Sequence, residues 1–212
     1  MRDPSRRLFR PRASVIKRLI ILNVAMFFFT LLGGKEAIEL LGLSSGALAR
    51  FQVWRLVSYM FAHGGLGHLF FNMWGLYFFG TPVEQRLGPQ RFLRLYLLSG
   101  LVGAGLWLWA NWSHKHFLLI GASGGVFGVM MAAAMSFPNM QILLLFPPIP
   151  MKLRTMVLIY AVIEVLQAWQ GSWGGIAHLA HLGGLLGAFF YMKHLGFPSP
   201  YLWFRNTWVK QN

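Results

Sequence analysis

Apolar runs of close to 20 residues recur along the chain, separated by short polar segments. A helix needs about 20 apolar residues to cross a bilayer, so this pattern predicts transmembrane helices. Six are expected, at about residues 16–34, 66–83, 92–112, 118–137, 153–170 and 174–193. The predicted fold class is an all-α polytopic membrane protein, with six transmembrane helices in one compact bundle.

The basic residues are divided unevenly between the two sets of connecting segments. Seven lie before or at the start of the first run, three follow the second, two follow the fourth and three follow the sixth, whereas four fall on the other side. Lys and Arg concentrate in cytoplasmic loops, so both ends of the chain are expected in the cytoplasm. This predicts a basic tail at residues 1–15, a membrane domain at 16–195 and a short tail at 196–212. A targeting role for the Arg-rich first tail stays open.

The composition agrees with a membrane protein. Hydrophobic residues make up 56% and charged residues 11%, against roughly 45–50% and 25% in soluble proteins. The net charge of +14 would suggest nucleic acid in a soluble domain. Here membrane topology accounts for the charge, and no nucleic-acid partner is expected. The chain has no Cys, which excludes disulfides, thiolate metal sites and a Cys nucleophile.

Polar side chains inside apolar spans are costly, so each is a functional candidate. The second span opens with His68 and Asn72, which share one helix face; the fourth opens with Ser123, and the sixth carries His181. These three spans run in the same direction. At a rise of about 1.5 Å per residue, all four side chains lie at a similar depth below the outer surface. The coincidence predicts one polar site built from three helices.

The residue types suit nucleophilic catalysis. A serine needs a neighbouring base, and histidine is the usual one, so Ser123 and His181 form a candidate pair. His68 and Asn72 can stabilise an oxyanion. Small residues at matching spacings in the fourth and sixth spans would let those two helices touch. These are Gly124, Gly128, Gly184 and Ala188.

Other interpretations of the polar residues must be weighed. His178 shares a face with His181, but His181 lies one turn deeper and precedes Gly184, so it is the preferred base. Ser123 could be only a packing residue. The two histidines could hold a metal with His68, but no carboxylate is expected beside them, so neither a metal nor another cofactor is predicted. The histidines at 63, 114 and 116 are expected to be solvated in loops.

Several of these residues fall into motifs that are specific in combination. The motifs are Trp54-Arg55, the H-x4-H-x3-N element that ends at Asn72, Glu84 with Arg86 and Gly88, Gly121-Ala122-Ser123-Gly124, and Ala180-His181 with Gly184. Together they resemble the rhomboid family of intramembrane serine proteases, over about residues 50–190. Trp54 and Arg55 lie in a long first loop. Whether that loop is interfacial or an ordinary external loop stays open.

The resemblance has definite implications. It implies a six-helix rhomboid-like bundle, a Ser123–His181 dyad without a third member, and an oxyanion hole of His68, Asn72 and the Ser123 amide. Transmembrane proteins would be the substrates, membrane lipid would surround the protein, and a bacterial cytoplasmic membrane would be the location. The oligomeric state is not predicted. A proteolytically inactive relative and a small transporter are the alternatives.

A carboxylate is not expected to complete a catalytic triad. The chain has five acidic residues, and only Glu164 falls near the right depth. A charge there would be costly without a partner. Because the family resemblance implies a dyad, replacing Glu164 by Gln is expected to keep activity within about tenfold, whereas disabling a triad carboxylate costs about 10⁴.

Overall fold

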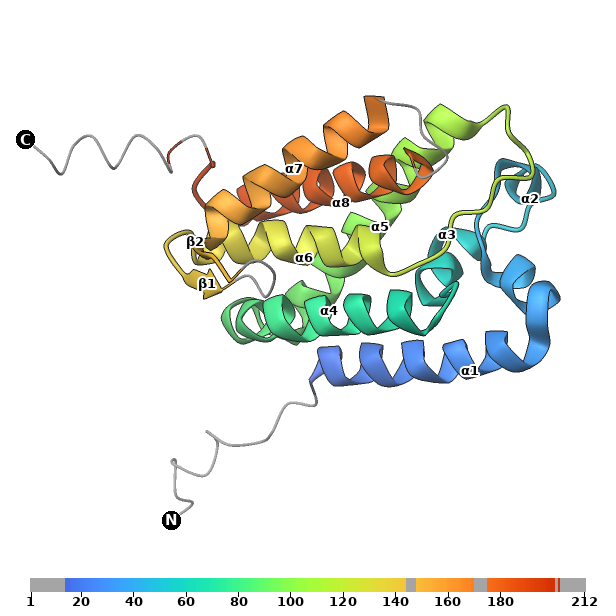
Figure 1. Cartoon of the computed structure of the whole chain (residues 1–212), viewed down its shortest axis with the longest axis horizontal. Coiled ribbons are helices and arrows are strands. Elements are labelled where there is room, and N and C mark those ends of the chain that lie inside the picture. The colour runs from blue at the N-terminus through green and yellow to red at the C-terminus, as the bar shows by residue number, and fades with distance from the viewer. Residues whose placement is uncertain (1–13, 144–147, 170–174, 201, 203–212) are drawn as a thin grey trace, which may run out of the picture.

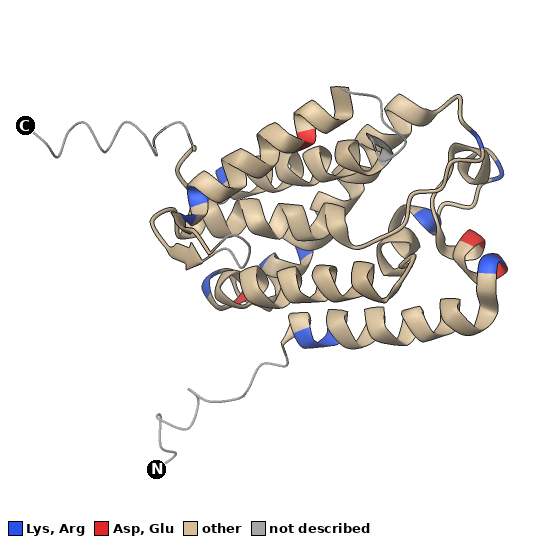
Figure 2. Cartoon of the chain, in the orientation of Figure 1, with Lys and Arg blue, Asp and Glu red and all other residues tan. Residues whose placement is uncertain are grey.

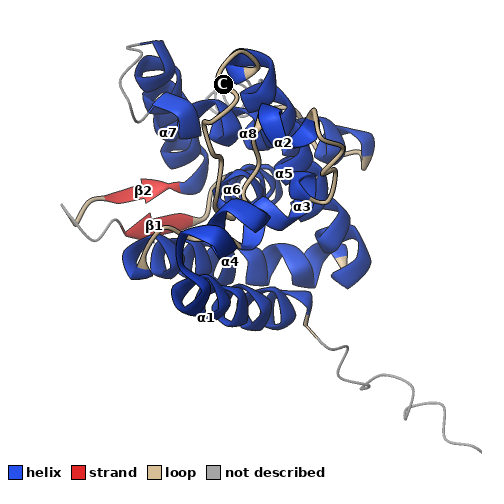
Figure 3. Cartoon of the chain, turned by 90° about the vertical axis from the view of Figure 1, so that its right-hand side faces the viewer, coloured by secondary structure: helices blue, strands red, loops and turns tan. Residues whose placement is uncertain are grey.

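Most of the chain described by the structure is helical. The computed structural model describes residues 14–143, 148–169, 175–200 and 202. Its longer helices lie side by side in one bundle, with a small two-stranded hairpin at one edge (Figures 1 and 3). The predicted tails at 1–15 and 196–212 fall largely outside the described residues, so their cytoplasmic location stays a prediction.

The predicted spans correspond to six longer helices. The bounds are α1 Val15–Leu41, α4 Leu66–Leu87, α5 Pro89–Asn111, α6 Ser123–Ser136, α7 Leu153–Trp169 and α8 Gly175–His194. Among the described residues, α1 and α5 are long and apolar enough to cross a membrane by length and composition. The structure thus supports an all-helical fold, and the count of six spans stays a prediction.

Short elements that the apolar pattern did not predict connect these helices. They are α2 Ser45–Leu48, α3 Arg55–Ser58 and the 3₁₀ turn η2 Tyr59–Phe61 in the first loop, and the strands β1 Gln141–Leu143 and β2 Pro150–Lys152. The two strands pair antiparallel, with Ile142 opposite Met151. Strands of three residues are too short to show an alternating pattern.

Helix α1 extends further than the predicted 16–34. At Gly34 the backbone leaves the helical region, with φ 61° and ψ −147°, and a second helical segment then continues to Leu41. The start of α1 is held by Glu84 from the end of α4, whose carboxylate accepts from Ser14 Oγ at 2.7 Å and from the backbone N–H of Val15 at 2.6 Å. A carboxylate at a helix N-terminus also interacts favourably with the helix dipole.

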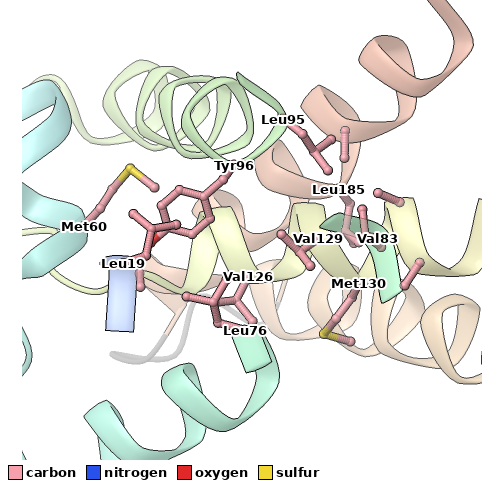
Figure 4. Close-up of a cluster of buried hydrophobic side chains, with 14 of the residues drawn as sticks. Leu19, Met60, Leu76, Val83, Leu95, Tyr96, Val126, Val129, Met130 and Leu185 are labelled. Atoms are coloured by element: carbon pink, nitrogen blue, oxygen red, sulfur yellow. The ribbon is translucent and has the colours of Figure 1, made fainter. Parts of the chain in front are cut away.

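The core lies between α4, α5, α6 and α8. Helix α8 packs most extensively against α5 and α6, and α6 also packs against α4. Figure 4 shows part of this core, where Leu76, Tyr96, Val126 and Leu185 come from those four helices and are all buried. Helices α4, α6 and α8 all begin at the same end of the bundle (Figure 1), so the polar site that is predicted at the start of these three spans lies at that end.

Helices α6 and α8 touch through their backbones, as the small residues predicted. A Cβ atom added at Gly184 would collide with the carbonyl oxygen of Gly124, and one at Gly128 would lie 3.0 Å from the Gly184 oxygen and collide with Ser99. No larger side chain fits between these helices without moving them apart. This contact decides how close residues on α6 and α8 can come.

The first loop is tied to the end of α1. Three side chains of the loop donate to three successive carbonyl oxygens there, at 3.3, 2.8 and 2.8 Å: Trp54 to Leu40, Arg55 to Gly42 and Ser58 to Leu41. Arg55 is buried, and its desolvation lowers the pKa of its guanidinium group below the ordinary value. These bonds satisfy carbonyls that the helix itself leaves without partners.

Charged side chains are sparse in the middle of the bundle. Figure 2 shows Lys and Arg gathered mainly at the end where α1 and α7 begin and around the opposite end of α1. An acidic residue interrupts the apolar length of α7; it is Glu164, which is 6% exposed. A carboxylate in that position needs polar partners.

Candidate active site

The segment before α6 fixes the position of Ser123. Leu43 and Leu119 exchange backbone hydrogen bonds of 3.0 and 2.8 Å, and the N–H of Gly121 donates to Tyr59 at 2.9 Å. The predicted helix start at residue 118 is therefore wrong, because Leu119 and Gly121 bond to the first loop and Gly121 has φ 117°. Helix α6 begins at Ser123 itself, so the hydroxyl lies beside the unpaired N–H groups of the first turn.

Ser123 and His181 are brought into contact. His181 Nε2 lies 2.8 Å from Ser123 Oγ, which is hydrogen-bond distance between α8 and α6. The ring of Phe127 stacks on the imidazole with centroids 4.2 Å apart and planes inclined by 3°. Sequence reasoning missed Phe127, although its i+4 spacing from Ser123 puts it on the same face of the helix. The imidazole is thus held at its edge and on one face.

Glu164 of α7 lies against both histidines of α8. Its Oε2 atom is 2.5 Å from His178 Nδ1 and 3.1 Å from His181 Nδ1. The contact with His181 is at ion-pair distance but off the line of a straight hydrogen bond. The expectation that no carboxylate stands beside these histidines is therefore wrong. The sequence gives the depth of Glu164 but not the direction in which α7 presents it.

His68 lies next to the serine. A Cβ atom added at Gly121 would be 2.7 Å from His68 Cε1 and Nε2 and 3.8 Å from Ser123 Oγ. The ring of His68 therefore occupies the space that a larger residue at 121 would fill. Only glycine combines this close approach with a positive φ.

His63 stands behind His68, with ring centroids 5.0 Å apart. The expectation that it is solvated is wrong, because it is 2% exposed. Burial, followed by the nearby His68, lowers the pKa of His63 to about 4. His114 and His116 are exposed, as predicted.

Asn72 is buried one turn after His68 on α4. Its Nδ2 donates to the carbonyl oxygen of His68 at 2.9 Å, within its own helix. A primary amide has two N–H groups, so this bond leaves a second one for another acceptor. The structure gives Asn72 a fixed orientation, and contact with a reacting oxygen stays a prediction.

Among the described residues, Glu164, His178 and His181 form a group whose donor atoms lie within 4.8 Å of one another. A tetrahedral zinc ion with bonds of about 2.0–2.1 Å would hold its donors about 3.3 Å apart. The 2.5 Å between Glu164 and His178 is instead a hydrogen-bond distance. The shortest of these separations is thus that of a hydrogen bond, and the absence of a metal from the site stays a prediction.

The chain is similar to a known protein family. The family model "Rhomboid domain" matches residues 50–196. Rhomboid protease GluP of Bacillus subtilis (strain 168) is 32% identical over 187 residues, covering 85% of this chain and 34% of the relative. The mitochondrial RHOMBOID-like protein 12 of Arabidopsis thaliana is 32% identical over 149 residues, covering 61% of this chain and 42% of the relative.

The chain spans less than half the length of these two relatives. Inactive RHOMBOID-like protein 8 of Arabidopsis thaliana is 42% identical over 64 residues, which cover 30% of this chain and 18% of the relative. These relatives therefore include one that is named a protease and one that is named inactive. The extent of the domain match and the identity to GluP show that this chain, an integral membrane protein, belongs to the rhomboid family.

Proposed function

We propose that this chain is an intramembrane serine endopeptidase that hydrolyses peptide bonds in or near transmembrane segments of membrane proteins. Ser123 is the nucleophile and His181 is its base. The observation that carries the proposal is the 2.8 Å separation of Ser123 Oγ and His181 Nε2, in a family whose relatives include named proteases. No cofactor takes part.

The first chemical step transfers one proton and forms one bond. His181 Nε2 accepts the proton of Ser123 Oγ as the oxygen attacks the substrate carbonyl carbon. The resulting imidazolium donates that proton to the peptide nitrogen, the C–N bond breaks, and the amine product leaves an acyl ester on Ser123. Water then attacks the ester with His181 again acting as base, which releases the acid and restores the serine.

Negative charge develops on the substrate carbonyl oxygen during both attacks. The N–H of Ser123 is available there because the first turn of α6 has no intrahelical acceptor for it. His68 lies beside Gly121 at the same place and supplies a second donor, and Asn72 supplies a third through its remaining N–H. Gly121, Gly124 and Gly184 contribute by allowing the close approaches that bring these groups together.

The short α6 accounts for access of water. Its 14 residues extend about 21 Å, whereas the hydrocarbon core is about 30 Å thick. If α6 reaches the cytoplasmic surface at Ser136, Ser123 lies about 9 Å below the outer surface, where the loop before it replaces helix.

We infer six transmembrane helices, both termini in the cytoplasm and a bacterial cytoplasmic membrane as the location.

The second candidate is a proteolytically inactive membrane-protein binder. It is favoured by one observation, namely that an inactive relative is 42% identical over 64 residues. Such a protein would bind transmembrane helices without cutting them. The serine–histidine contact favours the protease instead.

The proposal is tested with detergent-purified protein and a single-span substrate. The wild type should cleave it and should react at Ser123 with a fluorophosphonate probe, as located by mass spectrometry. Ser123→Ala should lose both activities while keeping its melting temperature. Undiminished cleavage by Ser123→Ala, or labelling at another serine, contradicts the assignment of the nucleophile.

A matched pair of histidine variants tests the base. His181→Ala should lose cleavage, because His181 is the histidine in contact with Ser123. His178→Ala should retain much more, because His178 contacts Glu164. The opposite order of activities would assign the base to His178. Cleavage by neither the wild type nor any variant, with the substrate still bound, would favour the inactive binder.

A further inference from the structure

Glu164 is a buried carboxylate that the dyad mechanism does not use. It is the one acidic residue of α7 and is 6% exposed, in a helix that is otherwise apolar apart from its ends. A charge in such a position is costly and persists only with polar partners. Its partners are the two histidines of α8, one of which is the proposed base.

We propose that Glu164 is a positioning residue for the reaction: its carboxylate holds His181 in the tautomer and orientation that the base requires. The proposal rests on the proposed function. It departs from the two-residue mechanism that the family resemblance implies, because it adds a third group beside the base.

The tautomer follows from the two nitrogen atoms of the ring. A neutral imidazole carries one N–H and one lone pair, and an ionised carboxylate can only accept hydrogen bonds. With Glu164 Oε2 at 3.1 Å from His181 Nδ1, the hydrogen belongs on Nδ1. The lone pair is then on Nε2, which lies 2.8 Å from Ser123 Oγ. This is the arrangement in which histidine can take the serine proton.

The same carboxylate opposes the charge that forms during the reaction. When His181 takes the proton, its ring becomes an imidazolium with both nitrogens acting as donors. Glu164 then lies next to a positive charge, and because its own side chain is buried, water screens this charge–charge interaction only weakly. Phe127 covers one face of the ring, so Glu164 holds the edge that Phe127 and Ser123 leave uncovered.

His178 explains why the carboxylate is in place. Its Nδ1 atom makes the shorter contact with Oε2, at 2.5 Å, so His178 anchors the oxygen that His181 also approaches. The contact with His181 is longer and oblique, so it is an ion-pair contact and not a second straight hydrogen bond. His178 therefore contacts the carboxylate and not the serine.

The test compares Glu164→Gln with His178→Gln in the full-length protein, on a single-span substrate. An amide can present its NH₂ group to Nδ1, which would put the ring hydrogen on Nε2, the wrong side for a base. The contact between Glu164 and His181 replaces the tenfold limit expected from the sequence: Glu164→Gln should lose about 10²–10⁴ in kcat, since disabling a triad carboxylate costs about 10⁴. The KM should stay within about threefold, because Glu164 does not line the path of the substrate in this proposal.

Two further measurements separate positioning from packing. Glu164→Asp keeps an acceptor-only group and should recover at least about tenfold in kcat over Glu164→Gln, together with faster fluorophosphonate labelling of Ser123. The amide of His178→Gln can still donate an N–H to the Glu164 carboxylate, so this variant should keep at least a tenth of the wild-type kcat, even if its melting temperature falls. If Glu164 served only to satisfy His178, the two Gln variants would lose stability alike and kcat in neither.

The outcomes are distinguishable. A wild type that cleaves, with Glu164→Gln within tenfold of it in kcat, overturns the positioning role and leaves the protease assignment intact. A wild type that does not cleave or label overturns the protease assignment itself. If Glu164→Gln does not fold, Glu164→Asp is compared with His178→Gln. A lower kcat in Glu164→Asp than in His178→Gln supports the positioning role. A lower kcat in His178→Gln contradicts it.

Discussion

Gly121→Ala is the change for which the structure gives the clearest expected effect. The backbone at Gly121 has φ 117°, a conformation that residues with side chains rarely adopt. Such backbone strain costs of order 1–3 kcal/mol. The added methyl group would also lie 2.7 Å from two atoms of the His68 ring. Ordinary contact begins near 3.4 Å, so the ring must move by about 0.7 Å, which is enough to misplace a hydrogen-bond donor.

Two measurable losses follow. A destabilisation of about 1–3 kcal/mol corresponds to a fall of roughly 2–12 °C in melting temperature for a chain of this size. Misplacing one oxyanion donor should lower kcat by about 10²–10³. The assays are thermal unfolding in detergent and cleavage of a single-span substrate at saturating concentration.

Gly105→Ala is the matched control. Gly105 lies on the exposed face of α5, and an added Cβ atom would meet nothing within 4 Å. In a helix this substitution should be neutral or stabilising by up to about 1 kcal/mol, with wild-type kcat. If Gly121→Ala matched the wild type in both assays, the argument that Gly121 makes room for His68 would be refuted.

Three further changes test the supports of the site. Gly184→Ala adds a methyl group where the carbonyl of Gly124 lies. Overpacking of this kind costs about 1–3 kcal/mol of stability, and the separation of α6 from α8 should lower kcat more than tenfold. Unchanged unfolding and activity would contradict the close contact. Arg55→Met removes the donor to the Gly42 carbonyl. The free energy of unfolding should fall by about 1–3 kcal/mol, while kcat per folded molecule stays within threefold of wild type. A tenfold fall in kcat would instead give Arg55 a role in the chemistry. The pKa of His63 is about 4 in the folded chain, below a value near 6.5 in the unfolded chain, so the neutral buried ring contributes up to about 3 kcal/mol to the free energy of unfolding above pH 6.5, and this is lost as the pH falls toward 4. His63→Gln should therefore reduce the change of melting temperature between pH 6.5 and 4. The same slope in wild type and variant would refute the burial argument.

The sequence predicts best what depends on depth. Because α4, α6 and α8 run in one direction, counting residues from the start of each span puts Ser123 and His181 in one layer, and the structure has them 2.8 Å apart. The glycine spacing in spans four and six similarly predicts their contact. Both inferences need only the helical rise and the direction of each span.

What the sequence predicts poorly depends on rotation and on breaks in the helix. Glu164 has the right depth, but the sequence does not indicate which neighbour α7 faces, so the contact with His181 was not expected. The apolar pattern predicts the start of α6 five residues too early, because residues 118–122 are apolar enough for a span and the pairing of Leu119 with Leu43 is a tertiary contact. The sequence predicts a solvated His63, whereas the side chain is buried, because a loop residue carries no periodic pattern that signals burial.

The hydrogen bonds between Glu84 and the start of α1 have a consequence for the order in which the helices pack during synthesis. Val15 leaves the ribosome 69 residues before the carboxylate that binds its N–H. Until the end of α4 has been made, this bond to the start of α1 cannot form. Helix α1 is therefore fixed at this end only once α4 is present, and the pairing of α1 with α4 can form before α5, α6, α7 and α8 are synthesised.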